Sequence, residues 1–140
     1  MATFKRFEEI EVWRSARDLT KQVYTLTNQS AFMRDRSLRD QLRRSSVSIM
    51  ANIAEGFCRG GNREFVQFLA IAKGSVAESQ CHLYVAVDQG YITQGQFQDT
   101  YRQLDRIAAA LHSFMVYLQR SPIAGIKFKA AKSQIGKKAK

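Results

Sequence analysis

The sequence has 140 residues, of which 45% are hydrophobic, and its net charge is +10. This length predicts one domain with enough apolar side chains for a core. It contains no apolar run long enough to cross a bilayer and no signal-peptide pattern at the N-terminus, so we expect a cytoplasmic protein.

The positive charge is unevenly distributed along the chain. Residues 1–120 carry 16 basic and 12 acidic side chains, whereas residues 121–140 carry six lysines and no acid. We therefore expect a folded domain over residues 1–120 and a flexible basic tail over residues 121–140. The charge surplus favours a polyanionic partner, although a lysine-rich tail can also serve solubility alone.

Helical spacing of apolar residues dominates the first half of the chain, and strand-like alternation is scarce. The first predicted helix covers about residues 9–28, and a polar connection over residues 29–36 follows it. Ser37 is the predicted N-cap of the second helix, with Asp40 favourable in its first turn. The inner seam of that second helix advances in alternating steps of four and three residues: Leu38, Leu42, Ser45, Ile49 and Asn52.

Two further helices are predicted in the second half. The third covers about residues 62–88, with Gly61 or Asn62 as its N-cap and Gly90 as its stop signal. The fourth starts at a capping box formed by Thr93 and Gln96. Its seam again alternates steps of four and three: Phe97, Tyr101, Leu104, Ala108, Leu111, Met115 and Leu118. Four amphipathic helices with short connections predict an all-α, up-down-up-down four-helix bundle.

The second helix also carries polar side chains where a core helix would carry apolar ones. Ser45 and Asn52 lie in the seam, and a stripe beside it has steps of four, three and four: Ser48, Asn52, Glu55 and Arg59. A polar residue in a seam can fix the register of packed helices, and Glu55 can pair with Arg59 one turn later. We interpret Ser45, Ser48, Asn52 and Glu55 as a structural polar seam, with ligand or nucleic-acid contact as the alternative.

Signals for enzyme chemistry are weak. The polar seam has no histidine nearby to act as a general base, and its glycines do not form a phosphate-binding loop. A metal site would require Cys58, Cys81 or His82, and His112 to converge in space, because none of them shows a short ligand spacing. We therefore expect no catalytic residue, no metal and no cofactor.

Three blocks of sequence carry a resemblance to a known family. They read FEEIEVWRSARDLTKQVY, LRRSSVSIMANIAEGFCRGGNREFVQFLAIAKGSVAES and DQGYI, and together they cover about the first 92 residues. In this order they resemble the bacterial four-helix-bundle proteins of 23S ribosomal RNA intervening sequences. The chain has Met50 where many members have proline, and Gly61 where many have serine.

The resemblance implies a four-helix bundle that assembles as a homo-oligomeric ring, typically a pentamer. It also implies relatedness to the accessory (Avd-like) proteins of diversity-generating retroelements, which associate with a reverse transcriptase and with nucleic acid. No enzyme activity belongs to this family.

Arginine and lysine clusters supply the candidate nucleic-acid-binding residues, because such side chains neutralise phosphates. The candidates lie at the two ends of the second helix and in the tail: Arg36, Arg39, Arg43, Arg44, Arg59, Arg63, Lys127, Lys129, Lys132, Lys137 and Lys138. The leading hypothesis is a non-enzymatic oligomeric bundle that binds RNA or DNA and serves as an accessory to a ribonucleoprotein or a reverse transcriptase. The alternative is a protein-interaction scaffold whose polar seam and small residues Ala72, Gly74 and Ser75 pack subunits or a partner helix. Its basic charge would then be incidental, with many arginines paired to neighbouring acids.

Overall fold

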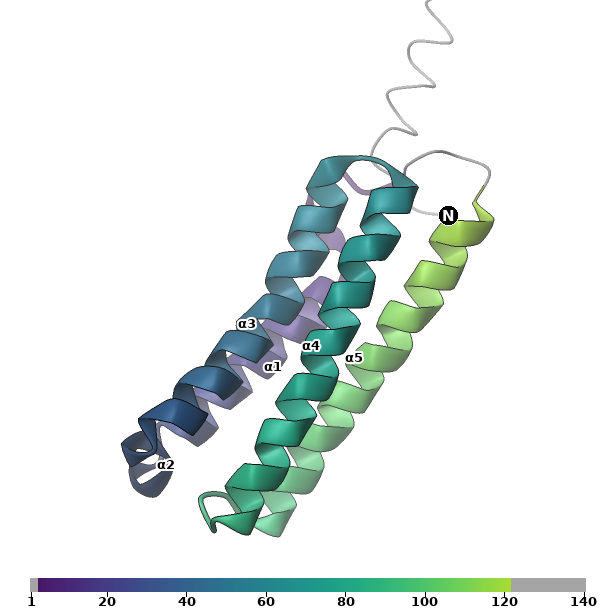
Figure 1. The fold of residues 1–140 in the computed structure, drawn as a ribbon. Helices are drawn as coiled ribbons and strands as arrows, with labels where there is room; N and C mark the ends of the chain where they lie inside the picture. The colour runs from purple at the N-terminus through teal and green to yellow at the C-terminus, as the bar shows by residue number, and fades with distance from the viewer. Residues whose placement is uncertain (1–2, 122–140) are drawn as a thin grey trace, which may run out of the picture.

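The structure is a computed structural model that describes residues 3–121. Its elements are the short 3₁₀ helix η1 (Phe7–Glu9) and the α-helices α1 (Glu11–Thr27), α2 (Ser30–Arg34), α3 (Arg36–Arg59), α4 (Asn62–Asp88) and α5 (Gln94–Arg120). The described part of the chain contains no strand. Its four long helices pack as α1 against α3, α3 against α4, and α4 against α5, with α1 also touching α5 (Figure 1). The predicted all-α bundle is confirmed.

The turn between α4 and α5 forms as its sequence predicts. Gly90 has a φ of +74°, and the Tyr91 N–H donates to the Ala86 carbonyl oxygen over 2.9 Å. Glycine follows helix ends in this way because it adopts positive φ without a Cβ clash. The Thr93 hydroxyl then accepts from the Gln96 N–H, and the Gln96 side chain accepts from the Thr93 N–H, both over 3.0 Å.

The start of α3 differs from the prediction. Asp35, and not Ser37, is the N-cap, since its Oδ1 accepts from the Leu38 N–H over 3.1 Å. Its Oδ2 accepts from the Tyr91 hydroxyl over 3.1 Å, and this hydrogen bond raises the pKa of Tyr91. Asp35 is the N-cap because one of its carboxylate oxygens caps the helix while the other bonds to Tyr91 in the α4–α5 turn. The Ser37 hydroxyl instead accepts from the side chain of Gln41 over 2.9 Å.

The connection over residues 29–36 is also more ordered than predicted, because it contains α2. The reason is Phe32, which is fully buried, with its ring centroid 5.5 Å from that of Tyr91. A single aromatic side chain in a polar segment gives no periodicity, so the sequence pattern did not reveal this helix. The short helix closes one end of the bundle.

The core follows the predicted seams in part, because several seam residues, Asn52 of α3 among them, are only half-buried. Leu19, Leu42, Leu69, Leu104 and Leu111 are fully buried, one or more from each long helix. At the start of α5, by contrast, the seam residues Phe97 and Tyr101 are only half-buried. Ala108 and Met115 of the same seam are half-buried as well, so the buried face of α5 consists of Thr100, Leu104, Ile107, Leu111 and Leu118.

Candidate functional site

Two members of the predicted polar seam, Ser45 and Ser48, lie between α3 and α4. The hydroxyls of Ser45 and Ser79 are 2.7 Å apart, and those of Ser48 and Ser75 are 2.9 Å apart. Ser45 and Ser79 are buried, and each hydroxyl also bonds to a carbonyl oxygen of its own helix. Each hydroxyl carries one hydrogen, so the pair can form only two of these three hydrogen bonds at a time. The small serine side chains also let the two helix backbones approach closely. Ser75 was predicted only as a small packing residue, and Ser79 was not predicted, although their four-residue spacing on one helix face was a usable signal.

The other two members of the predicted seam do not cross to another helix. The Asn52 amide donates to the Ser48 carbonyl oxygen over 2.8 Å, within α3. Glu55 is half exposed and pairs with Arg59 over 3.1 Å, as predicted. Inter-helix register is thus carried by Ser45 and Ser48, and Glu55 is no desolvated general base.

The cysteines and histidines stay separate. Cys58 and Cys81 take part in no disulfide within residues 3–121, both are exposed, and His112 is exposed on α5. His82 lies 3.8 Å from Glu78 on its own helix. No group of three or more potential metal ligands occurs within residues 3–121.

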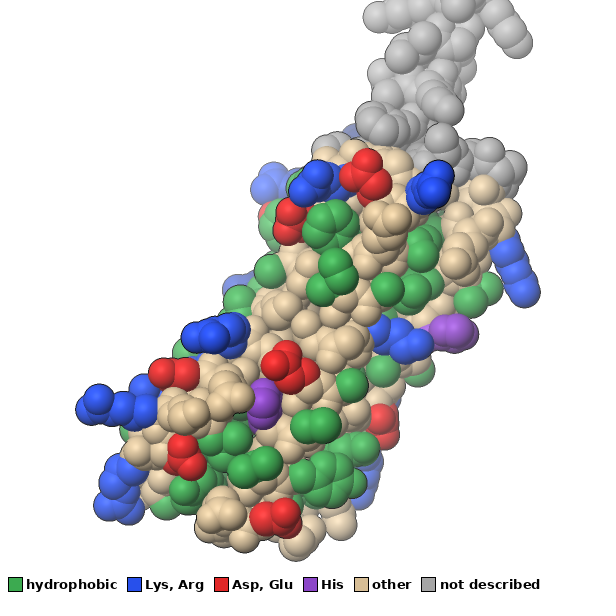
Figure 2. Space-filling view, in the orientation of Figure 1, with side chains coloured by type: hydrophobic (Ala, Val, Ile, Leu, Met, Phe, Trp, Pro, Cys, Tyr) green, Lys and Arg blue, Asp and Glu red, His purple; other side chains and the backbone are tan. Residues whose placement is uncertain are grey.

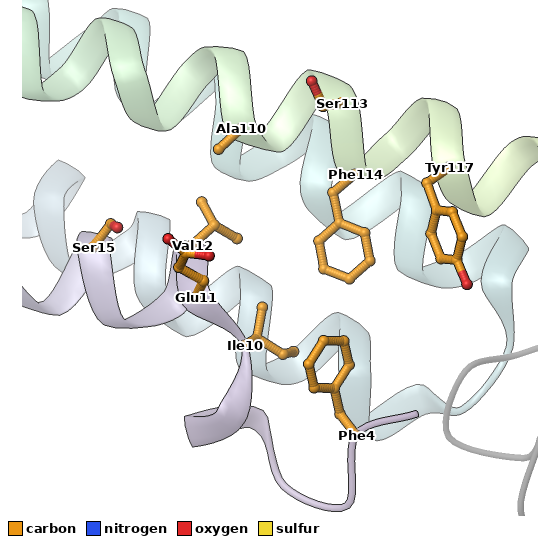
Figure 3. A pocket seen from close by; sticks show the side chains of 9 residues that line it. All are labelled: Phe4, Ile10, Glu11, Val12, Ser15, Ala110, Ser113, Phe114 and Tyr117. Atoms are coloured by element: carbon orange, nitrogen blue, oxygen red, sulfur yellow. The ribbon is translucent and has the colours of Figure 1, made fainter. Parts of the chain in front are cut away.

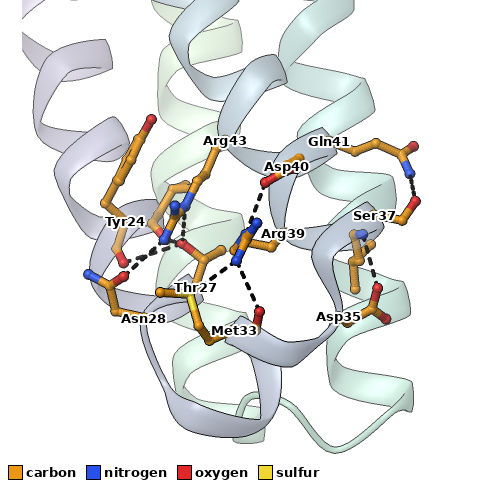
Figure 4. A network of polar contacts seen from close by, with 12 residues as sticks. Tyr24, Thr27, Asn28, Met33, Asp35, Ser37, Arg39, Asp40, Gln41 and Arg43 are labelled. Carbon is orange, nitrogen blue, oxygen red and sulfur yellow. Dashed lines mark hydrogen bonds and ion pairs between the residues drawn. The ribbon is translucent and has the colours of Figure 1, made fainter.

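Two of the candidate arginines are anchored in the structure. The Arg43 Nε donates to Thr27 Oγ1 over 2.8 Å and its Nη2 to Asn28 Oδ1 over 2.9 Å (Figure 4). Its guanidinium also lies 4.5 Å from the ring centroid of Tyr24, a cation–π contact. Arg43 therefore fastens the end of α1 to α3.

Arg39 plays the same part for α2. It donates to Asp40 over 2.9 Å and to the Met33 carbonyl oxygen over 3.1 Å, and its side chain is only 19% exposed. The hydrogen bond from Arg39 holds the pKa of Asp40 below its usual value, against a smaller desolvation effect that raises it; Arg43 and Arg44 lower it further.

The remaining cations around this end are exposed. Arg36 and Arg44 on α3, and Arg17 and Lys21 on α1, have no side-chain hydrogen bond or ion pair within the described chain. The Thr20 hydroxyl lies 3.3 Å from the Ser46 carbonyl oxygen, which brings the two helices into register here. Helical spacing places Arg17, Lys21 and Tyr24 on one side of α1.

These residues define a surface that we call the α1–α3 face: Arg17, Lys21, Tyr24, Arg36, Asp40, Arg43 and Arg44. A shallow hollow of about 360 Å³ opens in it, lined by Tyr24, Asp40, Arg43, Arg44 and Val47. The face carries five cations against one carboxylate, and that carboxylate is already paired with Arg39. It can attract phosphate groups.

The candidates at the other end of α3 are fewer. Arg59 pairs with Glu55, and its guanidinium lies 5.2 Å from the ring centroid of Phe68. Arg63 is exposed and has no such partner within residues 3–121. The tail candidates Lys127, Lys129, Lys132, Lys137 and Lys138 lie outside the described residues.

A second surface feature was predicted only in part: of the small residues Ala72, Gly74 and Ser75, Gly74 is exposed on α4, whereas Ala72 and Ser75 are buried within the bundle. On α4, exposed small or apolar residues advance in steps of four and three: Ala70, Gly74, Ala77, Cys81 and Tyr84. Beside them, Ile71 is 53% and Val85 45% exposed, and Tyr84 packs against Phe97 and Tyr101 of α5. We call this surface the α4 face; hydrophobic side chains are prominent over α4 and the neighbouring α5 in Figure 2.

A further hollow, of about 420 Å³, lies between α1 and α5. Figure 3 shows Phe4, Ile10, Phe114 and Tyr117 around it, with Glu11 at the rim. Its lining holds one carboxylate and no histidine, cysteine, lysine or arginine. Two serines, Ser15 and Ser113, also line the hollow, and neither is hydrogen-bonded to Glu11 within residues 3–121.

The comparisons with known proteins decide the family. A family model described as "23S rRNA-intervening sequence protein" matches residues 8–113, which is most of the chain. The chain belongs to this family. The resemblance seen in the sequence is thereby confirmed, while the relation to retroelement accessory proteins stays a prediction.

A crystal structure with a similar fold supports the architecture. It is that of a protein of unknown function from the S23 ribosomal protein family of Bacteroides thetaiotaomicron VPI-5482, with a TM-score of 0.67 and 22% identity. The match covers 74% of this chain and 97% of that one. No curated protein matches the chain. Neither the family description nor the description of the Bacteroides protein names a catalytic activity. Within residues 3–121, no helix has the length and apolar character needed to cross a membrane.

Proposed function

We propose that this family member is a non-enzymatic, homo-oligomeric helical bundle that binds nucleic acid through the α1–α3 face and the lysines of residues 121–140. In this role it serves as an accessory to a ribonucleoprotein or a reverse transcriptase. The observation that carries the proposal is the set of four exposed, unpaired cations on the α1–α3 face, namely Arg17, Lys21, Arg36 and Arg44. Such a surface attracts a polyanion because binding releases condensed counterions.

Binding is expected to depend strongly on salt. If one subunit neutralises about four phosphates of a single strand, affinity falls about 50-fold between 50 and 200 mM salt. Fluorescence anisotropy with labelled RNA and DNA oligonucleotides measures this directly. Replacing Arg17, Arg36 and Arg44 together by glutamine should weaken binding at least 10-fold and flatten the salt dependence.

The matched control replaces Lys73, Arg102 and Arg106 by glutamine, which removes the same charge from α4 and α5. This control should lose less affinity than the first triple variant. Absence of binding by the full chain at 50 mM salt would refute the nucleic-acid proposal. Equal losses in the two triple variants would refute the assignment to the α1–α3 face. Arg39 and Arg43 are left intact because their removal would also loosen the fold.

The α4 face supports the oligomeric part of the proposal. Its exposed residues repeat with the spacing of a helix-packing seam, although α4 already buries its opposite side in the core. Exposed apolar side chains in such a row favour contact with another protein surface. The small residues Ala70, Gly74 and Ala77 would let a second helix approach closely, and the proposed occupant is another copy of this chain.

Light scattering should give the full chain a mass that is a multiple of 16.0 kDa, with five subunits expected from the family resemblance. Ala77→Arg should shift the protein to monomer, because it places a charge in the middle of the α4 face. Ala109→Arg, the same change at an exposed position of α5, should leave the mass unaltered. A monomeric wild-type protein at micromolar concentration would contradict the proposed assembly.

The α4 face also supports a second candidate function, that of a protein-interaction scaffold with no nucleic-acid role. The triple glutamine variant of the α1–α3 face separates the two. Under the scaffold hypothesis, that variant retains assembly and partner capture, and the wild-type protein shows no salt-sensitive binding to RNA or DNA.

A further inference from the structure

We infer that the hollow between Tyr24 and Arg44 is a site for single-stranded nucleic acid, with a base stacked on Tyr24 and its phosphate held by Arg43 and Arg44. This inference rests on the proposed function and deepens it, because it assigns one site and one form of nucleic acid. It depends on how Arg43 and Tyr24 are held relative to each other.

Arg43 is fixed before any ligand arrives. Its Nε and Nη2 donate to Thr27 and Asn28, which leaves Nη1 without a hydrogen bond in the described chain. A side chain that is already ordered loses little further conformational entropy on binding. The free Nη1 group can therefore donate to a phosphate oxygen as a charge-assisted hydrogen bond. Arg44, the next residue on α3, lines the same hollow and supplies a second cation.

Tyr24 offers an aromatic surface next to these cations. The Arg43 guanidinium covers one side of the ring at 4.5 Å, and 41% of Tyr24 remains exposed. Figure 4 shows the ring standing beside the Arg43 side chain on the outer side of α1. Aromatic rings close to arginines form stacking platforms for unpaired bases, and stacking tolerates any base because each has a π-face.

The shape of the hollow favours a single strand over a duplex. It is shallow and has a volume of about 360 Å³, with Val47 as an apolar side wall. In a duplex the bases are already stacked and paired, so they cannot reach Tyr24 without being extruded. Asp40 also lines the hollow, and its negative charge keeps phosphates toward the Arg43 and Arg44 side.

The test measures the affinity of the full chain for a 12-nucleotide uridine RNA, the matching thymidine DNA, and a duplex of equal length at constant salt. Tyr24→Leu should weaken binding of the single strands about 10-fold, the loss expected for one stacked base. It should leave duplex affinity within about twofold, because the cations remain. Tyr24→Phe keeps the ring and should bind like wild type. Arg44→Ala should weaken binding of all three probes.

The outcomes separate this inference from the proposed function. If the wild-type protein binds none of the probes, the proposed function fails. If the wild type binds but Tyr24→Leu binds single strands equally well, the function stands and the stacking site is wrong. An equal loss for single strands and duplex, or a loss for Tyr24→Phe as large as for Tyr24→Leu, would also overturn the stacking site. Circular dichroism confirms that each variant is folded, and Arg44→Ala tests the phosphate contact should Tyr24→Leu unfold.

Discussion

Phe32→Ala is expected to lower the free energy of unfolding by about 3–5 kcal/mol, the range measured for large aromatic-to-alanine changes in cores. Phe32 is fully buried, and its ring lies 5.5 Å from that of Tyr91 in the α4–α5 turn. The change removes the only buried side chain of α2 and leaves a cavity at the end of the bundle. Without that anchor, α2 is too short to persist as a helix.

Urea unfolding at fixed protein concentration, followed by circular dichroism, measures this effect. Met33→Ala is the matched control, because the neighbouring Met33 is 40% exposed and should cost less than about 1 kcal/mol. Similar midpoints for the two variants would show that α2 is not held by Phe32. If Phe32→Ala were as stable as the wild type, the packing of Phe32 against Tyr91 at the α2 end of the bundle would be contradicted.

Gly56→Ala is expected to cost about 2–3 kcal/mol, although alanine is ordinarily the better helix former. A Cβ at position 56 would lie 2.6 Å from the Phe68 Cβ and 2.9 Å from a Phe65 ring carbon. The nearer neighbour is fixed to the α4 backbone, so α3 and α4 would have to move apart. That movement would also stretch the Ser45–Ser79 contact of 2.7 Å farther along the same helix pair.

Gly95→Ala provides the control for Gly56→Ala. Position 95 lies in the first turn of α5, where the nearest atom to an added Cβ is the Thr93 hydroxyl oxygen at 3.8 Å. This variant should be unchanged or more stable by up to about 1 kcal/mol, because alanine restricts the unfolded chain. Thermal unfolding of both variants tests this. If Gly56→Ala raised the unfolding temperature as Gly95→Ala does, α3 and α4 would not be in close contact at Gly56.

The Phe32→Ala variant bears on the candidate binding surface as well as on stability. Phe32 and Arg39 hold the α2 segment against the start of α3, from which Arg36 projects. Loss of the packing at this end should therefore lower the affinity of the α1–α3 face for nucleic acid, even though no cation is removed. The triple glutamine variant, by contrast, should lose binding and keep its stability, because exposed unpaired cations contribute little to folding.

The helices themselves could be predicted because their signals are local. Apolar steps of four and three residues, the Thr93–Gln96 capping box and the Gly90 stop depend only on residues within one or two turns. Of the two N-caps predicted for α4, Gly61 and Asn62, the structure has Gly61, and the predicted Glu55–Arg59 pair is present for the same reason. Family membership could also be recognised, since its blocks are continuous stretches of sequence.

The sequence by itself determined the helices, most of their ends, the family and the excess of positive charge, all of which follow from neighbours along the chain. Only the tertiary structure decided which polar groups meet across helices. Between α3 and α4, the contact is made by Ser45 and Ser79, and Asn52 does not reach α4. Asp35 caps α3 in place of Ser37, and the burial of Phe32 makes a helix, α2, of the predicted polar connection. The structure also separated the anchored Arg43 from the exposed Arg44, two adjacent arginines that are indistinguishable in sequence. The physical reason is that burial and hydrogen-bond partners are set by residues far away along the chain.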